Sequence, residues 1–152
     1  MNEYLKLDLL TLEQLSKDAG KPIDEALYLQ SLHKADQDGL LFECRKQGML
    51  QGYFTLRKLE ESTWFIPMFV VHPQHRNKVV FTSLFSQLAR FISKHSIQKL
   101  VSNVLRNNTL SVNFHQRLGF AVTRENGLGY EFQLIINNKV LSQWKHLEKD
   151  RE

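Results

Sequence analysis

Residues 64–92 constrain the fold more than any other part of the sequence. Residues 64–71 are rich in aromatic and β-branched side chains, which favour a buried strand. A polar turn at residues 72–78 follows it. Apolar residues then resume at the spacing of a helix: Phe81, Leu84, Phe85, Leu88, Phe91 and Ile92. The sequence therefore predicts a central strand that leads directly into an amphipathic helix.

The polar turn is a candidate anion site. Where a strand runs into a helix, the first backbone N–H groups of the helix point to one place, and together with the helix dipole they attract anions. Arg76 and Lys78 add positive charge to this turn. The alternative, for a turn of this type taken by itself, is a plain connection with solvated charges.

Length and composition fit one domain, residues 1–152, with a core of its own. The hydrophobic fraction of 42% and the charged fraction of 24% are ordinary for globular proteins, so no long disordered region is expected. The net charge of +4 is mild, and no basic cluster resembles a nucleic-acid-binding arm. We therefore expect no nucleic-acid partner.

The same sequence indicates a cytoplasmic protein without a membrane partner. Its first residues lack the order of a signal peptide, and no apolar run approaches the roughly 20 residues that span a bilayer. The single cysteine, Cys44, excludes an internal disulfide and is expected to pack in the core. His33 and His95 lack the spacing of metal ligands, so no metal is expected.

The predicted helices and strands form an α/β (α+β) domain. From the N-terminus they are strand 4–10, helix 12–19, helix 22–38, strands 40–45 and 49–56, strand 64–71, helix 81–92, strand 99–105, helix 109–118, strands 120–123 and 130–136, and helix 140–149. This order, β-α-α-β-β-β-α-β-α-β-β, predicts a mixed, mostly antiparallel sheet of six to seven strands with helices on both faces. The crossover through helix 81–92 makes strand 99–105 parallel to strand 64–71.

Two residues predict irregular strands. Gly52 marks a bulge or the close approach of another backbone. Pro67, inside the central strand, favours a local loss of pairing, because proline has no N–H group to donate.

Residues 71–81, Val-His-Pro-Gln-His-Arg-Asn-Lys-Val-Val-Phe, resemble the acyl-CoA-binding segment of the GNAT superfamily of N-acetyltransferases. In that family a strand ends in Val-x-Pro and a helix begins with Arg/Gln-x-x-Gly-x-Gly/Ala. Arg76 keeps its place, whereas Val79 and Phe81 stand where the small residues belong. Small residues at these positions let backbone amides approach a pyrophosphate closely, so the side chains of Val79 and Phe81 would narrow the site. The alternative is that Val79 points into the core and that Phe81 is the first residue of the buried apolar face of helix 81–92.

Residues 108–120 resemble a second GNAT segment, Asn-x-x-Ala-x-x-x-Tyr-x-x-x-Gly-Phe. Ser111 replaces the alanine, and His115 replaces the tyrosine that often protonates the departing thiolate. The resemblance covers residues 64–136.

This resemblance implies that acetyl-CoA is the co-substrate. Its diphosphate would lie on backbone amides at the helix start, and its pantetheine arm would lie between strands 64–71 and 99–105. The residues implied in cofactor binding are Phe69, Val71, Arg76, Asn77, Lys78, Val79, Phe81, Thr82 and Asn108.

The implied reaction needs a base and an acid. The pKa of an alkylammonium group is about 10.4, so this group must lose a proton before its nitrogen can attack a thioester. Residues 62–71 contain no acid, so His72 is the candidate base, with Glu43 or Glu60 acting through water as alternatives. His115 is the candidate acid, because imidazolium gives a proton to a thiolate at little cost; a helix-surface position is its alternative.

The leading hypothesis is an N-acetyltransferase that moves an acetyl group from acetyl-CoA to a primary amine of a small molecule or protein. One alternative is a degenerate GNAT-fold domain that binds CoA or a protein partner without catalysis. Another is an acyltransferase that uses a longer acyl-CoA or an acyl-carrier protein. Residues 18–40 and 126–129, expected to line the acceptor site, hold no recognisable motif, and a homodimer through the C-terminal strand or the Trp144 tail stays open.

Overall fold

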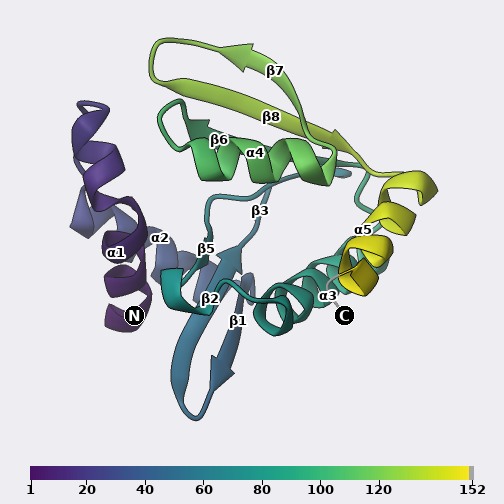
Figure 1. The fold of residues 1–152 in the computed structure, drawn as a ribbon, viewed down its shortest axis with the longest axis horizontal. Coiled ribbons are helices and arrows are strands. Elements are labelled where there is room, and N and C mark those ends of the chain that lie inside the picture. Colours follow the sequence, from purple (N-terminus) through teal and green to yellow (C-terminus); the bar gives the residue numbers. More distant parts are fainter. Residues whose placement is uncertain (151–152) are drawn as a thin grey trace.

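The computed structural model describes the backbone of residues 1–150 and the side chains of residues 1–144. Its strands form two sheets (Figure 1). The three-stranded sheet has the order β1-β2-β5 and comprises β1 (Leu41–Lys46), β2 (Met49–Thr55) and β5 (Phe69–Val71). The five-stranded sheet has the order β3-β4-β6-β8-β7 and comprises β3 (Arg57–Lys58), β4 (Thr63–Phe65), β6 (Lys99–Leu105), β8 (Gly129–Ile135) and β7 (Ala121–Glu125).

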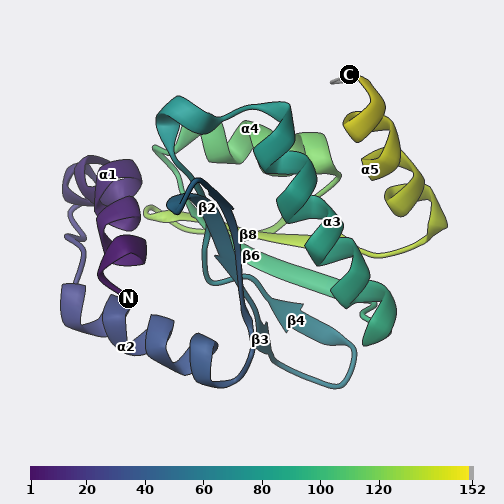
Figure 2. The same ribbon diagram turned by 90° about the horizontal axis from the view of Figure 1, so that it is seen from below.

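The helices lie on both sides of the strands, as the sequence predicted. Figure 2 shows α1 and α2 on one side and α3 and α5 on the other. The helical segments are α1 (Asn2–Asp18), α2 (Glu25–Gln37), the short 3-10 turn η1 (Pro73–His75), α3 (Lys78–Lys94), α4 (Thr109–Leu118) and α5 (Asn138–Asp150). No helix among the described residues is long and apolar enough to cross a membrane.

The predicted central strand is divided at Pro67 into β4 and β5. Before the proline, the Ile66 N–H donates to the Val101 carbonyl on β6 at 2.9 Å. After it, the Met68 carbonyl accepts from the Thr55 N–H on β2 at 3.0 Å. The chain therefore changes hydrogen-bond partners across the proline, and the predicted loss of pairing there is confirmed.

The predicted strand at residues 4–10 is wrong, because α1 runs without interruption from Asn2 to Asp18. Tyr4 and Asp8, four residues apart, are buried on one helix face, whereas Leu10 is 57% exposed. Thr11, the residue before the predicted helix 12–19, lies inside α1 and donates to the Leu7 carbonyl at 2.9 Å. The alternation of apolar residues in 4–10 is typical of a strand, but the burial of these residues follows the spacing of a helix.

The other predicted elements are present, with small shifts at their ends. β1 and β2 form the predicted hairpin, and β4 pairs with β6 in parallel. Gly52 lies at a bulge, and its Cα faces the Val70 carbonyl so closely that a Cβ would lie 3.0 Å from that oxygen. α2 begins at Glu25 rather than Pro22, because Asp24 caps it by accepting from the Leu27 N–H.

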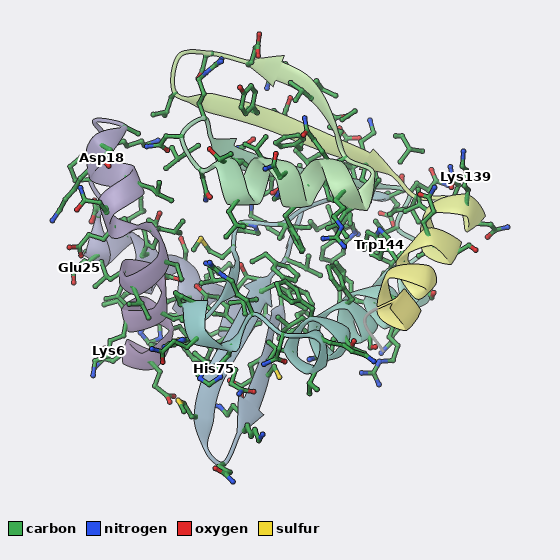
Figure 3. The ribbon with its side chains drawn as sticks, viewed as in Figure 1. Lys6, Asp18, Glu25, His75, Lys139 and Trp144 are labelled. Atoms are coloured by element: carbon green, nitrogen blue, oxygen red, sulfur yellow. The ribbon has the colours of Figure 1, made fainter. Side chains whose placement is uncertain are left out.

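The three-stranded sheet separates two hydrophobic cores. Tyr53 faces the smaller core with Tyr4, and Phe54 faces the larger core beneath α3. Trp144 joins the larger core from α5, and its indole N–H donates to the Leu118 carbonyl at 3.0 Å (Figure 3). The Trp144 side chain therefore packs within its own chain.

Gly129 provides a test of this packing. A Cβ on Gly129 would lie 2.3 Å from the Val104 carbonyl, whereas one on Gly127 would meet no atom within 4 Å. We expect Gly129→Ala to lower the free energy of unfolding by about 1–3 kcal/mol, because the backbone of β6 or β8 must move. Urea denaturation measures this, with Gly127→Ala as the matched control; equal stability of the two variants would contradict the packing.

Candidate acyl-transfer site

The candidate site lies where β5 and β6 separate. β4 pairs with β6 from Thr63 to Phe65, but β5 pairs with β2. β6 pairs with β8 from Lys99 to Leu105, but with β4 only as far as Val101. The two sheets therefore open from the Pro67 break, at the place where the sequence predicted the pantetheine arm.

An aromatic cluster lines one side of this opening. Phe114 of α4 lies 5.9 Å from Phe69 of β5, 5.4 Å from Phe81 and 5.8 Å from Phe85 of α3, measured between ring centroids. Phe81 is partly buried against the larger core, but the first fully buried residue of α3 is Val80 and not the expected Phe81. Of the residues predicted to bind the cofactor, Phe69 and Phe81 meet here, whereas Val71 is buried and paired with Gly52.

The turn between β5 and α3 is fixed by hydrogen bonds to histidines. The His72 Nδ1 accepts from the Gln74 N–H at 3.1 Å, and the His75 Nδ1 lies 3.3 Å from the Gln51 amide nitrogen on β2. The ring centroids of His72 and His75 lie 4.9 Å apart. Burial, and then the positive charges of His75 and Arg76, lower the pKa of His72, so this candidate base is neutral near pH 7.

Most of the predicted diphosphate residues come together at the start of α3. Asn77 caps this helix, since its Oδ1 accepts from the Val80 N–H at 3.2 Å. Arg76 is exposed beside it. Val79 is 73% exposed, so the interpretation that it points into the core is wrong, while Thr82 lies half-buried one turn further on.

His115 is buried, with 8% of its surface exposed, so the helix-surface alternative is wrong. Its Nδ1 donates to the Ser111 carbonyl at 2.8 Å, which leaves Nε2 to accept from the Ser102 hydroxyl at 2.9 Å. Burial lowers the pKa of His115 and so favours this neutral form. The acid role predicted from sequence therefore requires a second proton on Nε2, where Ser102 now donates.

Asn108 lies at the start of the same helix. Its Oδ1 accepts from the Ser111 N–H at 3.2 Å, which makes it the N-terminal cap of α4. Gly119 ends α4 in the left-handed conformation, with φ of 102°.

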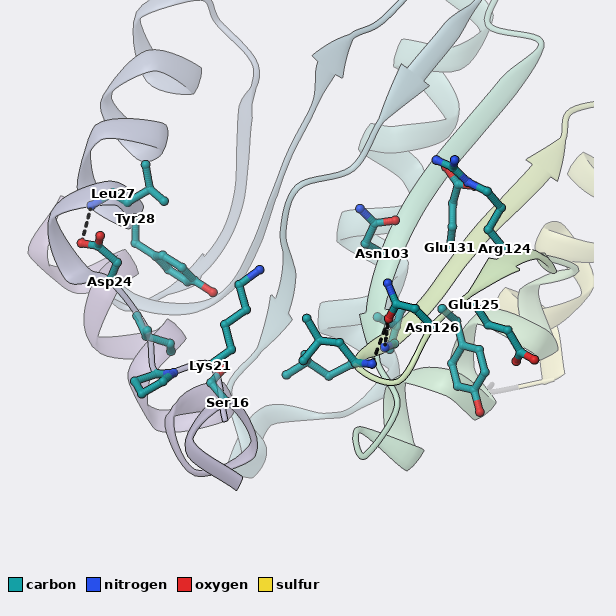
Figure 4. A pocket seen from close by; sticks show the side chains of 17 residues that line it. Ser16, Lys21, Asp24, Leu27, Tyr28, Asn103, Arg124, Glu125, Asn126 and Glu131 are labelled. Atoms are coloured by element: carbon teal, nitrogen blue, oxygen red, sulfur yellow. Dashed lines mark hydrogen bonds and ion pairs between the residues drawn. The ribbon is translucent and has the colours of Figure 1, made fainter. Parts of the chain in front are cut away.

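Two cavities lie on the α1–α2 side. One, of about 740 Å³, is bordered by the α1–α2 connection and by β6 and β8; Figure 4 shows Lys21 and Tyr28 facing Asn103 and Asn126 across it. The other, of about 1040 Å³, lies between α2 and the strand break and includes Pro67 and Met68 in its wall. Parts of both segments expected to line an acceptor site, 18–40 and 126–129, border these cavities.

The two alternative bases lie outside these cavities. Glu43 accepts hydrogen bonds from Tyr4 and from Arg45. Burial favours a higher pKa for Glu43, but these two hydrogen bonds outweigh it and hold the pKa below its usual range. Glu60 is exposed in the turn before β4, where its N–H donates to the Thr63 carbonyl.

Asp8 is an acid that sequence reasoning missed. It is fully buried on α1 and borders the larger cavity together with Tyr28. Its Oδ1 accepts from the Tyr53 hydroxyl at 2.5 Å, and its Oδ2 has no hydrogen-bond partner among the described residues. Burial raises its pKa to about 7, although the Tyr53 hydrogen bond opposes the shift. Reading residues 4–10 as a helix would have revealed a charged residue within the apolar stripe.

Comparison with known proteins decides the family. The sequence model of the Acetyltransferase (GNAT) domain matches residues 12–139. The chain belongs to this GNAT family. Its membership makes it a GNAT-type acyltransferase, as the sequence predicted. Comparison with curated proteins gives no match.

Solved structures share this GNAT fold at low sequence identity. PaiA N-acetyltransferase of Thermoplasma acidophilum, in complex with coenzyme A, aligns with a TM-score of 0.70 at 13% identity over 89% of this chain and 92% of its own. A Pyrococcus horikoshii OT3 protein has a TM-score of 0.71 and 20% identity over 90% of each chain. A GNAT family acetyltransferase of Elizabethkingia anophelis with acetyl-CoA bound has a TM-score of 0.58 and 18% identity over 78% of this chain and 94% of its own.

Asp8 gives the stability of this GNAT domain a testable pH dependence. Its pKa is about 7 in the folded state, against an ordinary value of 3.8, so the folded protein retains a proton that the unfolded chain loses. The stability due to this group is therefore full below pH 3.8 and falls as pH rises to about 7, by as much as about 4 kcal/mol.

Asp8→Asn removes this dependence while keeping an acceptor for Tyr53. The variant and the parent should be about equally stable at pH 4, and the variant should become the more stable as pH approaches 8. Urea denaturation at several pH values measures the difference, with Asp18→Asn, an exposed change on the same helix, as the control. A difference that stays constant with pH would contradict a raised pKa at Asp8.

Proposed function

We propose that this GNAT-type acyltransferase moves an acetyl group from acetyl-CoA to a primary amine. The observation that carries the proposal is the change of partners at Pro67, which separates β5 from β6 and leaves main-chain groups of β5 facing an opening. Support comes from the GNAT proteins of the same fold, which hold coenzyme A or acetyl-CoA.

The donor enters, in this proposal, from the side of α3 and α4. The diphosphate lies on the first amides of α3, where the exposed Arg76 supplies a charge-assisted hydrogen bond. The Val79 side chain points to solvent, so it borders the phosphates without occupying the core.

The acceptor enters from the opposite side, through the cavities beside α1 and α2. The amine nitrogen then meets the thioester carbonyl at the strand break, and both cavities border Tyr28. We assign the proton that the departing thiolate takes up to His115, and His72 stays the base predicted from sequence.

The aromatic cluster favours a second candidate function. Phe69, Phe81 and Phe114 pack together on the donor side, where a pantetheine arm has to pass. If these rings do not separate, the domain binds a partner or another acyl carrier and does not use acetyl-CoA.

Calorimetric titration with acetyl-CoA and with free CoA distinguishes the two functions. Micromolar binding, equivalent to about 8 kcal/mol, is expected for the acetyltransferase. Absence of binding by both ligands would overturn it in favour of the second candidate.

Val79 supplies a sharper test of the diphosphate site. We expect Val79→Gly to lower the Kd of acetyl-CoA by about threefold to tenfold, since removing the side chain lets phosphate oxygens approach the helix amides. Leu110→Gly is the matched control, because Leu110 is also an exposed second residue of a helix, α4. Equal Kd values for Val79→Gly and the parent would remove Val79 from the site.

His115 is tested by separating turnover from binding. His115→Phe should reduce acetyl transfer by about 100-fold, the scale of one general acid, while the Kd of acetyl-CoA stays within about twofold. Thermal unfolding of the variant is measured alongside, because the change also removes the acceptor of the Ser102 hydroxyl. Unchanged turnover would give His115 a packing role alone.

A further inference from the structure

We propose that Asp8 and Tyr53 form the binding site for the acceptor ammonium group, and that Asp8 accepts its proton before acyl transfer. The acyl-transfer part of this inference rests on the proposed function, whereas the binding part does not. Asp8 lies outside residues 12–139, which match the GNAT domain, so family membership assigns it nothing.

Asp8 of α1 borders the same cavity as the strand break at Pro67. α1 packs against β2 and β5. The acceptor cavity in this proposal is the larger one, of about 1040 Å³. The same cavity is bordered by Asp8, by Thr55 at the end of β2 and by Pro67 and Met68 in the break. One cavity therefore runs from a buried carboxyl group to the place where the sheets open.

One oxygen of the Asp8 carboxyl group is an unsatisfied hydrogen-bond acceptor within the part of the chain that the structure describes. Tyr53 donates to Oδ1, and Oδ2 lacks a partner among the described residues although it is buried. A buried acceptor without a donor is unfavourable, and a charged donor makes the strongest hydrogen bond with a carboxylate. An ammonium group offers such donors, so it is the chemistry that this oxygen fits.

Tyrosines surround the carboxyl group and set its electrostatics. Tyr53 reaches it from β2, and on α2 burial, and then the charge of Asp8, raise the pKa of Tyr28. Tyr4, on the same helix as Asp8, packs edge-on against the Tyr53 ring at 5.1 Å. Tyr53 is fully buried, so its hydroxyl group holds Oδ1 in place and leaves Oδ2 for the ligand.

The walls of the cavity indicate the rest of the acceptor. It includes the apolar side chains of Leu27, Leu32, Leu40, Leu56, Pro67 and Met68, together with the charged side chains of Lys34, Asp38, Arg57 and Lys58. The apolar part of the wall is favourable for a carbon skeleton. The inferred acceptor is therefore a primary amine on an alkyl or arylalkyl group.

The reaction step balances with acetyl-CoA as the donor. Asp8 carboxylate takes one proton from the ammonium group, and the neutral nitrogen forms a bond with the thioester carbonyl carbon. The C–S bond then breaks as His115 gives the sulfur a proton, and His72 takes the second proton of the nitrogen. The products are an N-acetyl amine, CoA thiol and a protonated Asp8, which releases its proton to water.

The binding part is tested by ¹³C NMR of protein labelled at the aspartate carboxyl carbon. The resonance lost in Asp8→Asn identifies Asp8, and its pH titration is followed with and without hexylammonium chloride at equal ionic strength. Because the ammonium group favours the carboxylate, hexylammonium should lower the midpoint by at least about half a pH unit. Hexan-1-ol is the uncharged control, and Asp18→Asn, on the exposed end of α1, should keep the shift. A midpoint that hexylammonium leaves unmoved would overturn the proposal.

The catalytic part is tested by acetyl transfer to hexylamine. Asp8→Asn should reduce kcat/KM by about 100-fold and abolish its rise with pH near 7, with the Kd of acetyl-CoA unchanged. Equal kcat/KM values for Asp8→Asn and the parent would refute proton transfer to Asp8. If the parent binds no acetyl-CoA or leaves hexylamine unmodified, the proposed transfer to this amine fails, and the NMR titration alone decides whether Asp8 is an ammonium site.

Discussion

The exchange of hydrogen-bond partners across Pro67 is the constraint on which the rest of the structure depends. Ile66 is the last residue bonded toward β6, and Met68 is the first bonded toward β2. Proline cannot donate a hydrogen bond, so the strand cannot stay in one sheet through this point. The two sheets and the opening between them follow from this one break.

The break also gives the molecule two chemically different sides. On the side of α3 and α4, aromatic rings from three elements pack at the opening, and the basic start of α3 lies beside them. On the side of α1 and α2, the larger cavity has apolar side chains and a buried carboxyl group in its wall. An acyltransferase needs such a division, since its donor and acceptor are different molecules that must meet at one carbon atom.

Much of this arrangement is readable from sequence because it is encoded locally. The aromatic segment 64–71, the helical spacing after residue 78 and the helix 109–118 each depend on neighbouring residues, and the structure contains them, with the aromatic strand divided at Pro67. The partners of His115 and Asp8 depend instead on distant segments, β6 for the histidine and β2 for the aspartate. The N-terminal strand failed for a related reason. Alternating apolar residues satisfy both periods, and only packing against the sheet selects the helix.

The same break raises the chain-entropy cost of forming the candidate site. Each hairpin, β1–β2 and β7–β8, joins strands that are close in sequence, so little chain entropy opposes its closure. The parallel pairing of β4 with β6 must instead close a loop from Thr63 to Lys99 that contains α3. The opening between the sheets is complete only when this loop has closed, so forming the candidate site costs more chain entropy than forming either hairpin.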